Sequence, residues 1–312
     1  MRMPDNKNVS IIICTYNRAE LLRECLESLC QQTSDMSRMD VIVVDNNSTD
    51  GTAEIVRGFA DRLSRLRNVF EPDQGLSHAR NRGFREAATE WVAYLDDDAR
   101  AFPDYVEKFL IAIRKNEFDC IGGVYLPWYK YGRPKWYMDS YGTNAGKAAG
   151  LLKDDFASGG NMIIKKDILE RFGGFSDRVG MSGKKIAYGE ETRLQVMMRQ
   201  EGLKIGFDPT IRIEHLVSLH KQTPMWFIRS SFAVGRNYWD AFLIPPSFLL
   251  VTRSLASTFI KLVKQAFGKL PALFLRRDYY IQNWFIDVFS PVSLAAGLTV
   301  GFFAAPGPGR KG

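Results

Sequence analysis

The sequence predicts an α/β fold, a sheet flanked by helices, followed by a helical C-terminal region. In the first two thirds of the chain, short apolar runs rich in β-branched residues alternate with segments whose apolar residues recur at helical spacing. Beyond residue 217, long apolar stretches broken by basic residues replace this alternation. Alternating strands and helices favour a parallel sheet covered by helices on both faces.

Strands and helices follow one another regularly before Pro103. The expected strands are Val9–Cys14, Asp40–Val44, a short one near Val69–Phe70, and Trp91–Leu95, and the expected helices are Ala19–Gln32, a segment opened by Asp50-Gly51, and a segment after Gly75 that runs through Ala88. In the first helix, Leu22, Cys25, Leu26 and Leu29 share one face. Because ligands of such sheets bind beyond the carboxyl ends of the strands, the polar residues that follow each strand are the candidate site.

The pattern becomes mixed after Pro103. We expect helices at Tyr105–Lys115, Lys166–Phe172 and Gly189–Glu201, and strands at Asp119–Leu126 and Phe156–Ile164. The stretch Pro127–Lys153 is rich in Trp, Tyr and Gly and has no clear periodicity. It therefore predicts a long loop that acts as a lid or a binding loop.

Length and composition limit the class of protein. A chain of 312 residues that is 46% hydrophobic can bury one core with an appended element. The four cysteines form no C-x-x-C pair and have no histidine at zinc-ligand spacing, which predicts a reducing compartment without structural disulfides or zinc. The N-terminal stretch MRMPDNKNVS has no apolar segment, so we expect no secretory signal.

The net charge of +7 is concentrated at the C-terminal end. From Leu216 onward there are 11 Lys/Arg and 3 Asp/Glu, whereas the residues before it hold 31 and 32. This distribution argues against nucleic-acid binding and for a basic, apolar tail on a membrane surface. We expect two domains, an α/β domain at 1–217 and a helical extension at 218–312.

Two stretches of the tail bear on how it meets a membrane. Phe248–Phe267 carries three basic residues among leucines and phenylalanines, as is typical of an interfacial amphipathic helix. Val288–Gly309 is uncharged for 22 residues, nominally enough to span a bilayer, although its prolines and glycines weaken that interpretation. Peripheral association with anionic lipid is favoured, and a spanning end or a packed helical subdomain are the alternatives. Pro306–Gly312 is expected to be a flexible end.

Three consecutive aspartates, Asp96, Asp97 and Asp98, follow the strand Trp91–Leu95. Adjacent carboxylates repel one another, and a bound divalent cation would relieve that repulsion. Ligation by oxygen suits Mg²⁺ or Mn²⁺, which commonly bridge a carboxylate and substrate phosphates. The alternative is an acidic surface turn with no ligand.

Several motifs, taken in order, resemble those of the family 2 glycosyltransferases, of the kind that builds bacterial polysaccharides and exopolysaccharides. They are SIIICTYNRAELL at 10–22, VIVVDNNSTDGT at 41–52, GLSHARNRG at 75–83, YLDDDA at 94–99, FASGGNMIIKKDIL at 156–169, FGGF at 172–175 and GEETRL at 189–194. Several ordered motifs are far more specific than any one of them. The resemblance implies the GT-A fold of that family, a Rossmann-like mixed sheet flanked by helices. It also implies an inverting transfer of a sugar from a nucleotide diphosphate donor.

The resemblance also implies how the donor is bound. The segment Thr15, Tyr16, Asn17 and Arg18 matches the loop that packs on the nucleoside. Asp45 matches the acid that binds the base or ribose, with a helix cap or turn residue as the alternative.

Arg80 matches a basic position that meets the diphosphate, and its alternative is a solvated arginine on a helix. Asp96 and Asp98 form the DXD pair, with Asp98 as the direct metal ligand and Asp96 facing the ribose and the metal. Asp97 belongs to the donor-binding set without a role of its own. His215 is expected after the last core strand as a third metal ligand or a contact of the diphosphate, with a structural histidine as the alternative.

An inverting displacement needs a base for the acceptor hydroxyl. The resemblance assigns this role to Glu191 and makes Glu190 a neighbouring acceptor-binding or orienting carboxylate. The family usually has Glu-Asp here, so the longer Glu191 is a departure from its pattern. The alternative is a pair of first-turn acids favoured by the helix dipole.

Weaker expectations concern the acceptor side. Asn161 and Gly159-Gly160 are expected to shape it, and Trp128 and Trp136 to stack on sugars or to pack within the loop. His220 is a weaker candidate than His215, and His78 is expected to be a surface or packing residue.

The leading interpretation is a metal-dependent inverting glycosyltransferase that uses Mn²⁺ or Mg²⁺ and a nucleotide sugar, with UDP favoured by the family. It would act on a lipid-linked or polysaccharide acceptor, in the cytoplasm, at the inner face of the membrane. One alternative is a nucleotidyltransferase, although CTYNRAE stands where such enzymes more often carry a Gly-rich phosphate loop. Another is a non-catalytic membrane-bound scaffold, which would be expected to lose the triplet or the acidic pair.

Overall fold

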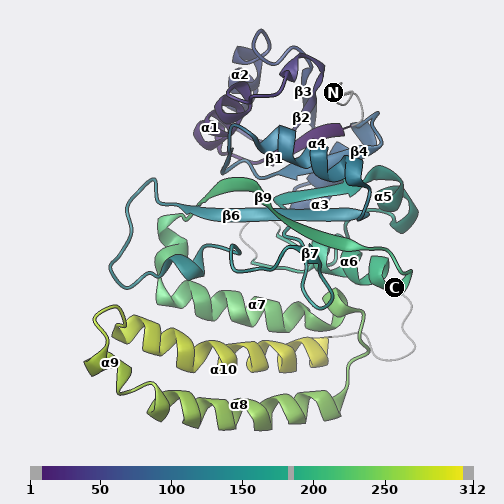
Figure 1. The fold of residues 1–312 in the computed structure, drawn as a ribbon. Helices are drawn as coiled ribbons and strands as arrows, with labels where there is room; N and C mark the ends of the chain where they lie inside the picture. Colours follow the sequence, from purple (N-terminus) through teal and green to yellow (C-terminus); the bar gives the residue numbers. More distant parts are fainter. Residues whose placement is uncertain (1–8, 182–185, 305–312) are drawn as a thin grey trace. The chain divides into compact units, whose positions relative to one another are not determined.

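The computed structural model describes residues 9–181 and 186–304. The chain divides into two compact units that are interleaved in sequence and are described separately (Figure 1). Unit 1 comprises Met1–Trp128, Gly142–Asp177 and Leu194–Leu216, and unit 2 comprises Tyr129–Tyr141, Arg178–Arg193 and Val217–Gly312. The expected domain division after residue 217 differs from these units by Val217, which belongs to unit 2, and by the two earlier segments of that unit. Residues 1–8 of the N-terminal stretch and the end Pro306–Gly312 lie outside the described residues.

Unit 1 is built on a mixed sheet, which has nine strands within the described residues, in the order β3-β2-β1-β4-β8-β6-β9-β5, with β7 paired to β9. The strands are β1 Val9–Thr15, β2 Asp40–Asp45, β3 Leu66–Phe70, β4 Trp91–Leu95, β5 Ala99–Ala101, β6 Cys120–Trp128, β7 Gly150–Leu151, β8 Asn161–Lys165 and β9 Ile205–Leu216. The first four strands pair in parallel, and β8 pairs antiparallel with both β4 and β6. The predicted mixed sheet is confirmed.

Helices cover both faces of this sheet (Figure 1). Unit 1 contains α1 Ala19–Cys30, α2 Thr52–Gly58, α3 Leu76–Glu86, α4 Tyr105–Lys115, α5 Lys166–Phe172, the part of α6 (Glu190–Gln200) from Leu194 onward, and the 3-10 turn η2 Met36–Arg38. Ile11 and Ile13 of β1 point into one apolar core, whereas Ile12 points into the other. Because both faces are buried, the central strands are continuous apolar runs, which is why they were predicted correctly.

The predicted strand and loop differ from the structure around residues 127–161. The strand expected at Phe156–Ile164 begins only at Asn161, because Gly159 and Gly160 form a turn. The segment expected to be a loop contributes its first two residues to β6 and forms the short strand β7. Strands this short have no detectable periodicity, so neither β5 nor β7 was predicted.

Unit 2 is helical in its C-terminal part. Its elements are η3 Asp139–Tyr141, the first turn of α6, η4 Leu219–Gln222, α7 Pro224–Phe242, α8 Phe248–Gly268, α9 Ala272–Leu275 and α10 Ile281–Ala304. Within this unit α10 lies between α7 and α8 (Figure 1). The amphipathic helix predicted at Phe248–Phe267 corresponds to α8, and the predicted uncharged stretch begins inside α10.

Glycines allow α7 and α10 to approach closely. A Cβ atom built at Gly235 of α7 would lie 2.0 Å from the carbonyl oxygen of Leu294, and one built at Gly297 of α10 would lie 2.1 Å from that of Phe232. The indole Nε1 of Trp239 also donates to the Leu298 carbonyl at 3.0 Å. The two helices therefore form a tightly packed pair.

Candidate active site

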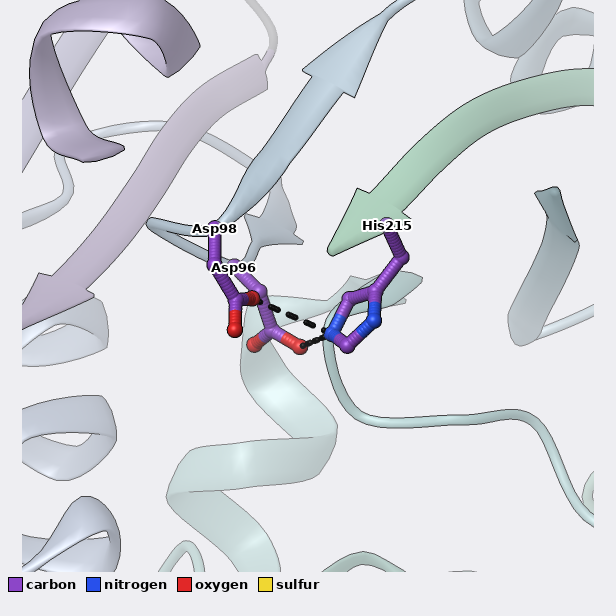
Figure 2. A group of neighbouring side chains, drawn as sticks. All are labelled: Asp96, Asp98 and His215. Carbon is purple, nitrogen blue, oxygen red and sulfur yellow. Dashed lines mark ion pairs between the residues drawn. The ribbon is translucent and has the colours of Figure 1, made fainter. Parts of the chain in front are cut away.

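Pairing between two strands of unit 1 brings the predicted metal ligands together. Asp96 and Asp98 follow β4, and the next residues form β5, which pairs antiparallel with β9 so that Ala99 stands opposite His215. The backbone N–H of Leu216 donates to the carbonyl of Asp98 at 2.9 Å. His215 therefore lies within β9, rather than after the last strand as expected, and its ring faces the two carboxylates (Figure 2).

The resulting cluster has the donor atoms of a divalent cation site. His215 Nε2 lies 3.1 Å from Asp98 Oδ1 and 3.4 Å from Asp96 Oδ2 (Figure 2), and one donor atom from each residue lies within 4.8 Å of the others. Burial raises the pKa of Asp96, but its contact with His215 outweighs this and leaves that pKa below its ordinary value. Two carboxylates and an imidazole suit Mn²⁺ and also accommodate Mg²⁺. The three predicted ligands fit such an ion.

Two adjacent glycines make room for the charged side chains of this site. A Cβ atom built at Gly160 would lie 1.8 Å from Asp96 Oδ2, and one built at Gly159 would lie 2.6 Å from Arg80 Nη2. The Asp96 N–H also donates to the carbonyl of Gly160 at 3.1 Å. These glycines therefore make room for Arg80 and Asp96, and the role on the acceptor side stays a prediction.

Arg80 is buried next to Asp96. Its Nη2 lies 3.9 Å from Asp96 Oδ1, and its guanidinium packs over the ring of Phe175 at 5.4 Å from the centroid. The alternative of a solvated arginine on a helix is wrong. A buried cation beside the aspartates is suitably charged for a phosphate, and contact with the diphosphate stays a prediction.

Arg18 links two of the three aspartates. Its Nη1 donates to Asp97 Oδ1 at 2.9 Å and to Asp98 Oδ2 at 3.2 Å. Burial raises the pKa of Asp97 to about 6, and the neighbouring Arg18 opposes that rise. The sequence placed Arg18 on the nucleoside loop and gave Asp97 no role. In the structure, each is a partner of the other.

The loops that follow β1 and β2 are tied together by short polar side chains. Thr15 pairs with Asp45 in the sheet, and Asn17 adopts a φ of 52°. Asn17 Oδ1 accepts from the N–H of Thr49 at 2.7 Å, and Asp45 Oδ1 accepts from the N–H of Ser48 at 2.9 Å. Asp45 thus makes the turn contact considered as its alternative role, and its nucleoside contact stays a prediction.

Tyr16 is exposed on the same loop. Its ring is accessible to a base or a sugar, which is compatible with its predicted place in the donor-binding set.

Glu190 and Glu191 begin α6 and belong to unit 2. Glu190 is buried and Glu191 is half-buried. The residue before them, Gly189, has a φ of 117°, a conformation that favours glycine. Their catalytic roles stay predictions.

Asn161 has a structural role. Its side chain is fully buried, where Nδ2 donates to the carbonyls of Val124 and Ile211, and Oδ1 accepts from the hydroxyl of Tyr105 at 3.3 Å. The expectation that this side chain shapes the acceptor side is wrong, because it joins β6, β8 and β9 inside the core.

The other aromatic and histidine candidates also make packing contacts. Trp136 is buried in an aromatic cluster of unit 2 with Tyr137 and Phe227. Trp128 lies under the guanidinium of Arg100 at 4.0 Å, and His220 packs against Trp226. Packing, one of the two interpretations given to the tryptophans, is what the structure shows for Trp136.

A helix-covered mixed sheet with an Asp-x-Asp and histidine cluster at the end of β4 defines a glycosyltransferase of the GT-A fold. Residues 10–173 match the model of Glycosyl transferase family 2, and the chain belongs to this family. The predicted fold and family are confirmed.

Two of the proteins that the chain resembles are glycosyltransferases of the archaeon Haloferax volcanii. The chain is 32% identical to Glycosyltransferase AglE of Haloferax volcanii over 177 residues, which cover 56% of this chain and 58% of AglE. It is 25% identical to the Glucosyl-dolichyl phosphate glucuronosyltransferase of the same organism over 236 residues, covering 73% and 75%. Among solved structures, the mannosyltransferase PcManGT from Pyrobaculum calidifontis, in complex with GDP-Man and Mn²⁺, superposes with a TM-score of 0.65 at 21% identity, covering 97% of this chain and 90% of that one. This last similarity shows the fold.

Proposed function

We propose that this protein transfers a sugar from a nucleoside diphosphate sugar to a lipid-linked or polysaccharide acceptor, with inversion at the anomeric carbon. The observation that carries the proposal is the convergence of Asp96, Asp98 and His215 beside the buried Arg80. The GDP-Man and Mn²⁺ of the PcManGT structure support a nucleotide-sugar donor and a divalent cation. A relative named for glucosyl-dolichyl phosphate supports a lipid-linked acceptor.

Different residues of unit 1 bind the metal ion, the diphosphate and the nucleoside of the donor. Asp98, Asp96 and His215 would hold Mn²⁺ or Mg²⁺, which when bound stabilises the negative charge of a departing nucleoside diphosphate. Arg80 adds a buried positive charge beside these ligands. Thr15–Arg18 and Asp45 bind the nucleoside, and Arg18 also holds Asp97 and Asp98 in place.

Glu191 is the proposed base. An inverting displacement removes one proton from the acceptor hydroxyl, and a carboxylate positioned beside that hydroxyl can accept it. Glu190 orients the acceptor or its neighbour Glu191. Replacing Glu191 with Gln should reduce transfer to a small residual rate and leave donor binding nearly unchanged. The matched control is Glu201→Gln, because Glu201 pairs with Arg171 on the surface. Loss of donor binding in Glu191→Gln would argue against the base assignment.

The decisive experiment is a donor screen. UDP- and GDP-sugars are incubated with the full chain in Mn²⁺, in Mg²⁺ and in EDTA, and the released nucleoside diphosphate is measured. We expect release from one donor class that requires the divalent ion. Nucleotide binding without release from any donor would favour the scaffold, and pyrophosphate release from a nucleoside triphosphate and a sugar phosphate would favour a nucleotidyltransferase.

We further propose that α8 and α9 place the enzyme on the inner face of the cytoplasmic membrane. The large apolar side chains of α8 point outward, with Phe259 67% and Phe267 72% exposed. The covered side of the helix holds Val251 and Leu262 together with the polar Ser254, Thr258 and Gln265. An ordinary surface helix turns its large apolar side chains inward, whereas most of those on α8 are exposed. Between Phe248 and Arg277 the chain has six basic residues and no acidic one, which complements anionic lipid.

The role of α10 supports peripheral association. Among the described helices, Ile281–Ala304 is the one whose length and composition would suit a membrane span. It is packed between α7 and α8, with the glycine contacts to α7 given above. We therefore assign α10 to the core of unit 2 and the lipid contact to α8.

Vesicle flotation tests the membrane proposal. The double variant Phe259→Ser/Phe267→Ser should lose most of its binding to vesicles that contain anionic lipid, while donor turnover in solution is unchanged. The control is Phe70→Ser, which removes an exposed phenylalanine from β3 of unit 1. Unchanged flotation of the double variant would rule out α8 as the docking surface.

A further inference from the structure

The segment before the acidic pair is bound by two neighbouring residues of α7. Arg236 Nη2 donates to the carbonyl of Ile186 at 2.8 Å, and Asn237 Nδ2 donates to the carbonyl of Tyr188 at 2.9 Å. Arg236 Nε also donates to Asn237 Oδ1 at 3.4 Å, which fixes the orientation of the amide. The two side chains thus form one hydrogen-bonded unit on the backbone that leads into α6.

Other residues of α7 hold the same segment from both sides. Ser230 donates to the hydroxyl of Tyr188 at 3.2 Å. Beyond the acidic pair, Arg193 Nη1 donates to the carbonyl of Asp240 at 2.8 Å. The contact residues of α7 are Ser230, Arg236, Asn237 and Asp240. They are six or seven and then three or four residues apart, so they share one face of the helix.

Gly189 fits against this face of α7. A Cβ atom built at Gly189 would lie 2.6 Å from the Cβ of Ala241. The first turn of α6, which begins with Glu190 and Glu191, therefore starts in contact with α7. The charges of Glu191 and Glu190, together with burial as the larger cause, raise the pKa of Tyr188. Tyr188, which α7 holds, precedes the two carboxylates by two and three residues.

The opposite face of α7 is fixed by α10. Gly235, the residue before Arg236, packs on α10. Gly301 of α10 packs against Arg236 itself, because a Cβ atom built at Gly301 would lie 2.3 Å from the carbonyl oxygen of Arg236. Arg236 is therefore positioned by the C-terminal helix pair.

We propose that Arg236 and Asn237 are positioning residues for the base of the transfer reaction: by holding the backbone of Ile186 and Tyr188 they set the orientation of Glu191. This inference rests on the proposed function, in which Glu191 is the base. The C-terminal helices then serve catalysis as well as membrane attachment.

The test separates positioning from folding by its kinetic signature. Arg236→Met and Asn237→Ala, made in the full chain, should lower kcat by roughly tenfold to a hundredfold, because a displacement of about 1 Å can have an effect of this size. The donor KM and the Mn²⁺ concentration for half-maximal rate should change by no more than about twofold, since uniform binding is not affected. Arg236→Lys, which keeps one donor, should recover part of the lost rate.

Arg229→Met is the matched control, because Arg229 is an exposed arginine of the same helix. Its kcat should equal that of the unaltered protein. If Asn237→Ala retains full kcat, or loses donor binding and kcat to the same extent, the positioning inference is overturned.

A double variant distinguishes this inference from the assignment of the base. In a Glu191→Gln background, Asn237→Ala should lower the residual rate no further, because the two changes act on one step. If Glu191→Gln by itself leaves the rate intact, the base assignment fails. If Glu191→Gln reduces transfer to a small residual rate while Asn237→Ala has no effect, the base assignment stands and the positioning role fails.

Discussion

The aspartate site of unit 1 and the helix α8 of unit 2 depart from an ordinary protein surface in opposite directions. At the end of β4, the charged side chains of Asp97, Asp98 and Arg80 are buried. On α8, Phe259 and Phe267 are exposed, although Val251 of the same helix is buried. Burying charge and exposing large apolar groups both have a free-energy cost unless a partner compensates.

The difference between the two regions indicates two kinds of ligand. The buried carboxylates already contact Arg18 and Arg80, and their oxygens together with His215 have the donor set of a divalent cation, which would complement a diphosphate. The exposed apolar side chains of α8, which lysines and arginines flank, suit the hydrocarbon region of a bilayer beneath anionic headgroups. Changes in one region should therefore leave the function of the other intact, and the predictions below are designed to find out whether they do.

The largest expected effect is on the metal site. Asp98→Asn removes one of the carboxylates that face His215, and we expect kcat with Mn²⁺ to fall by about a thousandfold or more, the scale of an electrostatic group acting on developing charge. Vesicle binding should be unchanged. The control is Asp278→Asn, an exposed residue paired with Arg276 in unit 2. Metal-dependent turnover that survives in Asp98→Asn would remove Asp98 from the ligand set.

The second prediction concerns the packing of α7 against α10 in unit 2. Gly297→Leu would drive a side chain into the backbone of Phe232, and because backbone cannot yield as a side chain can, we expect a loss of about 3 kcal/mol or more in the free energy of unfolding. Urea denaturation followed by tryptophan fluorescence measures this loss. Gly268→Ala at the end of α8 is the control, since a Cβ there meets nothing within 4 Å. Equal stability of the two variants would contradict the close packing of α7 and α10.

The third prediction concerns the arginine that holds the aspartates. Arg18→Gln should raise the Mn²⁺ concentration for half-maximal rate by about tenfold, because a charge-assisted bond to Asp98 is lost. The Mn²⁺ concentration for half-maximal rate of Arg18→Lys should lie between those of Arg18→Gln and the unaltered protein, since lysine offers a point charge without the planar guanidinium. Arg23→Gln, which changes an exposed arginine of α1, serves as the control. If Arg18→Gln changes only the donor KM, Arg18 contacts the nucleoside, as the sequence predicted, and does not support metal binding.

A smaller effect is expected from one lysine of α8. Lys264→Gln should weaken binding to anionic vesicles by about fivefold at low salt, which corresponds to about 1 kcal/mol for a basic residue near the surface. The effect should shrink at high salt because the attraction is screened. Lys115→Gln at the end of α4 in unit 1 is the comparison variant. Weakening that persists undiminished in high salt would mean that Lys264 contributes packing and not charge.

The sequence predicted the part of the fold whose signal is local. The strands β1, β2 and β4 are continuous apolar runs because helices cover both faces, and their predicted limits agree with the structure to within a residue. Asp96, Asp98 and His215 were chosen as metal ligands, and the structure brings all three together.

What was missed depends on contacts between distant residues. The pairing of β5 with β9 aligns His215 with the aspartates, yet β5 has three residues and leaves no pattern in the sequence. Nothing near Arg18 indicates that its partner is Asp97, 79 positions away. The amide of Asn161 bonds to core carbonyls that no local motif reveals. The run Gly159-Gly160 did signal a close approach, and only the structure shows that charged side chains occupy the space.

The smallest predicted effect comes from an ordinary ion pair of unit 1, outside the aspartate site. Asp119 Oδ1 lies 2.8 Å from Lys165 Nζ, and Oδ2 accepts from the N–H of Lys204 at 2.9 Å. Burial raises the pKa of Asp119, but these two partners outweigh it and hold the pKa below its ordinary value. Such a group stabilises the fold above its unfolded pKa of about 3.9 and loses that contribution as the pH falls through the lower folded value.

Asp119→Asn should therefore cost about 1 kcal/mol at neutral pH, and the difference from the unaltered protein should narrow as the pH falls below about 4. Chemical denaturation at a series of pH values measures it, with Asp167→Asn, at the first turn of α5, as a control. Transfer activity should stay intact, in contrast to Asp98→Asn. A stability difference that stays constant down to the lowest pH would mean that shape, and not the charge of Asp119, accounts for the loss. A fall in activity as large as that of Asp98→Asn would mean that the charges of unit 1 act as one network, and the contrast between an ordinary ion pair and the aspartate site would not hold.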